Sequence, residues 1–66
     1  MKKLHIDGHK VKYEVLGRYK ETEFEIIRFY NPGGIGSEPL DVIVLRINGE
    51  TDVAMATRAF NYIRMW

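Results

Sequence analysis

The chain has 66 residues, which suffices for one small domain (residues 1–66) and is too short for a two-domain enzyme. Hydrophobic residues make up 45% of it and charged residues 29%, a composition typical of a folded globule rather than a disordered tail. The formal net charge of +1 excludes an acidic mimic of DNA and gives only weak support to a strongly basic nucleic-acid binder.

The absence of cysteine excludes disulfides, thiolate nucleophiles and cysteine-based zinc sites, and it favours a reducing, intracellular setting. Apolar runs such as Val42–Leu45 are far shorter than the roughly 20 residues that a membrane span needs. No apolar signal-peptide segment follows Met1. We therefore expect a cytoplasmic protein that does not interact with membranes.

The first structural signal is Asp7-Gly8, which separates Leu4–Ile6 from the alternating run His9–Val15. It predicts a β-hairpin with a two-residue turn, because that turn needs positive φ at both central positions. The register then places Ile6 opposite His9 and Leu4 opposite Val11. One face collects Leu4, Ile6, His9, Val11, Tyr13 and Val15, and the other collects Lys3, His5, Lys10, Lys12 and Glu14.

A second tight turn centred on Lys20-Glu21 would return the chain as a third strand beginning near Phe24. This register sets Gly17 opposite Phe24 and Val15 opposite Ile26. Because Lys-Glu is poor chemistry for a two-residue turn, a four-residue loop or a bulge at Gly17 remains an alternative. The tight turn predicts two sets in the third strand: Phe24 and Ile26 facing inward, and Ile27 and Phe29 facing outward.

The β-branched run Leu40–Ile47 predicts a fourth strand, with Ile43, Leu45 and Ile47 on the inner face. From Thr51 onward the apolar residues follow the helical period, and Thr51 or Asp52 can cap the helix. The predicted helical stripe consists of Val53, Ala56, Ala59, Phe60 and Ile63.

The predicted fold is therefore α+β: a four-stranded antiparallel meander (β-β-β-β-α) with one C-terminal amphipathic helix packed on one face. The core would combine the helical stripe with inward-facing strand residues. These strand residues are Leu4, Ile6, Val11, Tyr13, Val15, Phe24, Ile26, Ile43, Leu45 and Ile47.

One helix covers only one face of a sheet, so the other face should be polar. Ile27 and Phe29 in the third strand, and Val42 and Val44 in the fourth, are predicted on that open face instead. Such an apolar patch marks an interface more often than an accident. The alternative is a bulge near Ile26-Ile27 that reverses the faces and buries Phe29.

Trp66 is a further interface candidate, because a terminal aromatic residue is hard to bury and Trp is enriched at interface hot spots. Met55 and Tyr62 widen the apolar stripe of the helix beside it, which broad packing on the sheet explains more simply than a partner does. A very small chain without disulfides often completes its stability by oligomerisation. We therefore expect a homodimer.

Chemistry for catalysis or metal binding is sparse. His5 and His9 would face opposite sides of the hairpin, so with Asp7 they do not converge on a metal ion. The loop Asn31–Pro39 resembles a phosphate loop only in its glycines, because a strand rather than a helix follows it. Ser37 is the only serine, and neither histidine has an evident orienting partner. We expect no enzyme activity, no metal and no cofactor.

The sequence thus favours a small non-enzymatic protein-binding module, acting as a homodimer and recognising an unidentified protein as an inhibitor or accessory factor. In general type it resembles the compact accessory and inhibitor proteins of phages and mobile elements. The alternative is a single-stranded RNA- or DNA-binding protein that uses the outer sheet face. Its contacts would be Lys10, Lys12 and Arg18, with Phe29 as a stacking ring.

Overall fold

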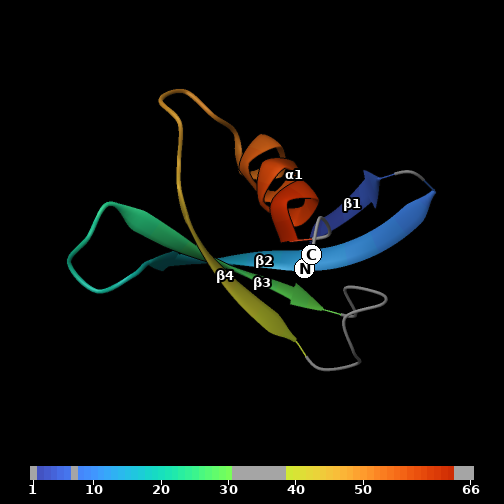
Figure 1. Ribbon diagram of the computed structural model, residues 1–66, viewed down its shortest axis with the longest axis horizontal. Helices are drawn as coiled ribbons and strands as arrows, with labels where there is room; N and C mark the ends of the chain where they lie inside the picture. The colour runs from blue at the N-terminus through green and yellow to red at the C-terminus, as the bar shows by residue number, and fades with distance from the viewer. Residues whose placement is uncertain (1, 7, 31–38, 64–66) are drawn as a thin grey trace.

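The computed structural model describes residues 2–6, 8–30 and 39–63 (Figure 1). Four antiparallel strands form one sheet in the order β1-β2-β3-β4, and helix α1 follows them. The predicted α+β fold, a four-stranded meander with a C-terminal helix, is therefore confirmed. The elements are β1 (Lys2–Ile6), β2 (His9–Arg18), β3 (Phe24–Tyr30), β4 (Leu40–Leu45) and α1 (Asp52–Ile63).

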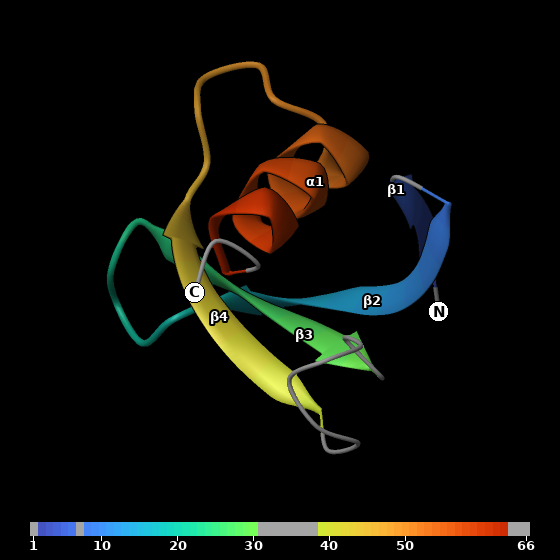
Figure 2. The ribbon, with the colours of Figure 1, turned by 45° about the vertical axis from the view of Figure 1, so that its right-hand side comes forward.

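The sheet is strongly curved, and α1 lies across its concave face (Figures 1 and 2). The β1–β2 hairpin has the register predicted from Asp7-Gly8, with Leu4 opposite Val11 and Ile6 opposite His9. Gly8 adopts a φ of 81°, which a residue with a Cβ rarely does. The turn chemistry and the alternation of side chains were sufficient to predict this hairpin.

The β2–β3 connection differs from the predicted two-residue turn. The backbone N–H of Tyr19 donates to the carbonyl of Phe24 at 2.8 Å, so residues 20–23 form a four-residue loop. The hydroxyl of Thr22 donates to the carbonyl of Tyr19 at 2.6 Å, and Lys20 takes a φ of 54°. The longer loop, which was the alternative, is therefore the correct one.

A β-bulge in β2 then changes which face each residue occupies. Val15 pairs with Ile27, but Gly17 pairs with Ile26, so Leu16 is an extra residue without a partner across the ladder. Gly17 sits at the bulge with a φ of 116°. Because side chains alternate strictly along a strand, one extra residue reverses the inward and outward sets of β3 relative to β2.

The predicted inner and outer sets of β3 and β4 are consequently exchanged. Ile27 and Phe29, predicted on the open face, are fully buried beneath α1, with Val44 also buried and Val42 packed against them. The expectation that these four side chains form an exposed interface is wrong. The inward prediction for five residues is wrong as well: Phe24, Ile26, Ile43, Leu45 and Ile47. The core is Leu4, Val11, Tyr13, Ile27, Phe29, Val44, Met55, Ala56, Ala59 and Phe60.

Arg28 supplies the physical reason for the exchange. The predicted register placed Arg28 opposite Tyr13, on the face that the helix covers. Its cross-strand neighbour Asp41 would lie there too, and taking such an ion pair out of water is costly. In the structure Phe29 pairs with Tyr13 instead, and Arg28 points outward between Glu14 and Asp41. The bulge thus exchanges a buried charge for a buried aromatic ring.

Helix α1 begins as its sequence predicts, because the Thr51 hydroxyl accepts a hydrogen bond from the Ala54 N–H at 3.2 Å. Its buried face is rotated from the predicted stripe: Met55 is fully buried, whereas Val53 is 50% exposed. The ring of Phe60 lies 5.6 Å from that of Phe29 at 54°. This tilted pair joins the helix to β3 at the centre of the core.

Candidate functional site

The open face of the sheet carries five neighbouring apolar side chains, which we call the outer apolar patch. Four of them are between 42% and 49% exposed, and Ile26 is half-buried. The register places Phe24 opposite Leu45 and Ile26 opposite Ile43, which joins β3 to β4, and Leu16 adds the bulge of β2. The outer apolar patch consists of Leu16, Phe24, Ile26, Ile43 and Leu45.

A row of charged side chains borders this patch. Arg28 stands opposite Glu14 on one side and Asp41 on the other. Its Nε donates to Asp41 Oδ1 at 2.7 Å and its second guanidinium nitrogen to Oδ2 at 3.1 Å. The hydrogen bond from Arg28 lowers the pKa of Asp41. Both signs of charge are therefore present at the border, and the patch itself contains none.

Beyond this row the open face becomes basic. Lys3 lies directly opposite Lys12, and His5 directly opposite Lys10, on β1 and β2. These four side chains are exposed, and we call them the basic cluster. Within the described residues, no salt bridge involves the three lysines. Like charges directly opposite each other destabilise a sheet, so the Lys3–Lys12 pair does not stabilise the fold.

Two residues predicted to contact nucleic acid do not lie with Lys10 and Lys12. Arg18 is paired with Glu25, whose other neighbour is the buried Val44, so Arg18 belongs to the helix side of the sheet. Phe29 is fully buried and unavailable for stacking on a base. An aromatic side chain that does reach the open face is Tyr30, which pairs with Lys12 and is half-buried.

A network of charges holds the connection between β4 and α1. Arg46 donates to both carboxylate oxygens of Glu25, at 2.6 and 2.9 Å, and to Asp52 Oδ1 at 2.6 Å. Lys2 completes it with a 3.1 Å salt bridge to Asp52, which joins the first strand to the start of the helix. Hydrogen bonds from Arg46 lower the pKa values of Glu25 and Asp52. These carboxylates stay ionised and serve the fold.

Glu50 and Arg58 form a second ion pair beside this network. Arg58 donates to Glu50 Oε2 at 3.0 Å and to Oε1 at 2.8 Å, and it also donates to the Leu45 carbonyl at 2.7 Å. The Arg58 hydrogen bonds, followed by the one from the Ile47 N–H, lower the pKa of Glu50 to about 2. An acid with so low a pKa is a poor proton donor or acceptor near neutral pH.

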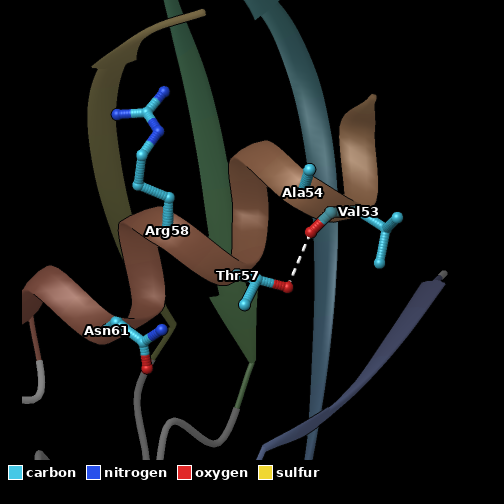
Figure 3. A pocket seen from close by; sticks show the side chains of 5 residues that line it. All are labelled: Val53, Ala54, Thr57, Arg58 and Asn61. Carbon is cyan, nitrogen blue, oxygen red and sulfur yellow. Dashed lines mark hydrogen bonds between the residues drawn. The ribbon is translucent and has the colours of Figure 1, made fainter. Parts of the chain in front are cut away.

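A shallow hollow lies along α1, lined by side chains of the helix alone (Figure 3). The Thr57 hydroxyl donates to the Val53 carbonyl at 2.7 Å, and Arg58 is paired with Glu50. Thr57 and Arg58 are thus committed to contacts within the protein. The hollow offers no activated nucleophile and makes a weak candidate; its lining is Val53, Ala54, Thr57, Arg58 and Asn61.

The remaining predictions concern residues that the structure does not describe, metal binding and membrane spans. Trp66 and the glycine-rich loop residues 31–38 lie outside the described residues, as do the side chains of Ile6 and His9. Across residues 2–6, 8–30 and 39–63, no group of three or more His, Cys, Asp or Glu side chains is placed to hold a metal ion. In the same ranges, no helix is long and apolar enough to cross a membrane.

Comparison of this chain with protein-family models, curated proteins and solved structures finds no match.

The open face carries an apolar patch, as the sequence predicts, but its members from β3 and β4 are not the predicted ones. Two apolar sets alternate along β3 and β4, and only one can face the helix. The positions of Arg28 and Asp41 distinguish the two sets. These residues form an ion pair across β3 and β4, and such a pair favours the face of the sheet that water reaches. Residues that alternate with Ile27 and Val42 then fall outward, which places Ile26 and Ile43 in the patch.

Proposed function

We propose that this chain is a non-enzymatic protein-binding module that forms a symmetric homodimer through the outer apolar patch. The observation that carries the proposal is the position of the patch: five apolar side chains from three adjacent strands share the face that α1 leaves uncovered. Contiguous apolar surface on a small folded protein more often serves association than it is left in water.

Charge favours a second copy of this chain as the occupant. A two-fold symmetric contact brings a surface against itself, so a charged surface would meet its own sign. The outer apolar patch has no charged member, and the row beside it supplies both Arg28 and Asp41. Face-to-face packing of two sheets would bury the patch without burying an unpaired charge.

The size of the chain favours the same occupant. A domain of about 60 residues buries only about 60% of the surface of its unfolded chain. With 66 residues and no cysteine, this chain has little other means of increasing its buried area. The proposal keeps the accessory or inhibitor role expected from the sequence, because binding another protein needs no nucleophile, metal or cofactor. It also keeps the expected cytoplasmic location.

The test is the oligomeric state of two matched variants, measured by sedimentation velocity over a wide concentration range. Ile43 in the patch is 49% exposed, and Val53 on α1 is 50% exposed. Ile43→Glu should weaken the dimer by more than about 30-fold, the effect of losing a hot-spot contact worth about 2 kcal/mol. Val53→Glu adds the same charge to an equally exposed β-branched position outside the patch and should leave the dimer intact.

Circular dichroism of both variants establishes that each is folded before the association constants are compared. A wild-type chain that stays monomeric at every concentration contradicts the proposal. Equal weakening by Ile43→Glu and Val53→Glu contradicts it too, because association would then not depend on the outer apolar patch.

A further inference from the structure

The basic cluster is a second feature of the open face, and the dimer contact does not account for it. Lys3, Lys10, Lys12 and His5 occupy four adjacent positions of the β1–β2 hairpin, all exposed. Side chains on one face of a sheet repeat at about 7 Å along a strand and about 5 Å across it. The hairpin therefore presents three lysine charges close together, with His5 beside them, separated from the outer apolar patch by the Glu14–Arg28–Asp41 row.

We propose that the basic cluster binds the phosphate backbone of single-stranded nucleic acid. The cross-strand pair Lys3–Lys12 is unfavourable by itself, and no acidic side chain of the described residues forms a salt bridge with either member. A polyanion relieves that repulsion when it binds, releasing its condensed counterions.

Tyr30 favours a nucleic acid over other polyanions. It lies opposite Lys12 on the same face, and its hydroxyl donates to Glu14 Oε1 at 3.0 Å. That hydrogen bond fixes the phenol hydroxyl on the open face, at the position opposite Lys12. Aromatic rings beside basic side chains on an open sheet are the usual platform on which unpaired bases stack.

An anionic lipid surface fits the same face less well. Glu14 and Asp41 lie on it between the basic cluster and the outer apolar patch. A flat membrane touching both of these features would also meet this row, in which Arg28 compensates one of the two carboxylates. The other carboxylate repels anionic headgroups. A single strand is narrow enough to follow the hairpin alone.

The test is fluorescence anisotropy with a labelled oligothymidylate of about ten nucleotides, titrated at several salt concentrations. Three lysine–phosphate contacts predict a salt slope of about 2, which is an affinity loss of about 20-fold between about 50 and about 200 mM salt. Lys12→Gln should reduce that slope by about 0.7. Arg18→Gln removes the same charge from the helix side of the sheet and should leave affinity and slope unchanged.

A further variant separates stacking from charge. Tyr30→Leu should lower the affinity several-fold at every salt concentration while leaving the slope in place, because a neutral ring releases no counterions. The absence of binding at low salt overturns the proposal, as does an equal loss in Lys12→Gln and Arg18→Gln. Vesicles containing phosphatidylserine are titrated in parallel, and binding to vesicles without binding to the oligonucleotide also overturns it.

Discussion

At the scale of single residues, two phenylalanines of the same strand have opposite environments. Phe29 is fully buried against Phe60, whereas Phe24 is 43% exposed on the open face. They are five residues apart, so an odd spacing alone sets them on opposite faces. The bulge decides which of them the helix covers.

Truncation of each phenylalanine measures that difference. Phe29→Ala should cost about 3–5 kcal/mol, because it removes a buried ring and leaves a cavity. A chain of 66 residues has only about 3–10 kcal/mol to lose, so this variant should lose a large fraction of its stability. Phe24→Ala should cost much less. Urea denaturation monitored by circular dichroism checks both, and a greater loss for Phe24→Ala would contradict the observed register.

Glu50 gives the molecule a defined response to acid. Its pKa falls from an ordinary value of 4.5 to about 2 on folding, because Arg58 and the Ile47 N–H donate to it. A carboxyl whose pKa is lower in the folded state stabilises that state above the ordinary pKa, and the stabilisation disappears as the pH falls through the folded pKa. Stability should therefore decline between about pH 4.5 and about pH 2.

The variant Glu50→Gln isolates this contribution. It should be less stable than the wild type at neutral pH, and the difference between the two should shrink as the pH approaches 2. Glu23→Gln is the charge-matched control, since Glu23 is exposed and forms no ion pair with any described residue. Thermal melts at a series of pH values check the prediction, and a pH-independent difference would contradict it.

At the scale of elements, the β-bulge determines the arrangement of the sheet. Lengthening the β2–β3 loop from two residues to four shifts the pairing by two positions and preserves the faces. Adding Leu16 as an unpaired residue shifts it by one and reverses them. The strand glycine Gly17 indicated a bulge, and the poor turn chemistry of Lys20-Glu21 indicated a longer loop. The observed pairing of β2 with β3 requires the bulge and the longer loop together.

Gly17 is the residue on which the bulge depends. Its φ of 116° is rarely adopted by residues with a Cβ, although no atom apart from those of Gly17 and its two chain neighbours lies within 4 Å of the position that a Cβ would take. Gly17→Val should therefore destabilise the protein through backbone strain alone, by about 1–3 kcal/mol. Arg18→Val, at the next position, should change stability by less than about 0.5 kcal/mol. Equilibrium unfolding of both variants tests this, and equal stability would contradict the strain.

At the scale of the whole molecule, one face of the sheet holds the core and the other carries the two candidate binding surfaces. The concave face is closed by α1, and the Arg46 network joins the helix start to β1 and β3. The opposite face carries the outer apolar patch over β3–β4 and the basic cluster over β1–β2. Both proposals therefore concern one continuous surface and can be examined with the same intact protein.

Association through the patch has a thermodynamic consequence for the whole chain. Any partner that binds only the folded state raises the melting temperature, and for a homodimer that partner is the protein itself. The melting temperature of the wild type should rise with protein concentration. That of Ile43→Glu should rise less over the same concentration range, because its dimer is weaker. Differential scanning calorimetry checks the contrast, and a concentration-independent wild type would contradict a homodimer.

Local signals in the sequence were enough to predict the elements, their order and the first hairpin. Asp7-Gly8 encodes a turn within two residues, alternation marks the strands, and Thr51 caps the helix, so each signal acts over a few residues.

Only the tertiary structure decided which side of β3 and β4 meets the helix. Ile26 and Ile27 are adjacent isoleucines with the same local propensity, so no local rule ranks one above the other as a core residue. The choice depends on interactions between distant residues: Phe29 can pack on Phe60, and the Arg28–Asp41 pair can lie on the open face, only if the bulge at Leu16 shifts the pairing of β2 with β3. Burial of the Phe29 ring and exposure of the Arg28–Asp41 ion pair both favour the observed inner face of β3 and β4.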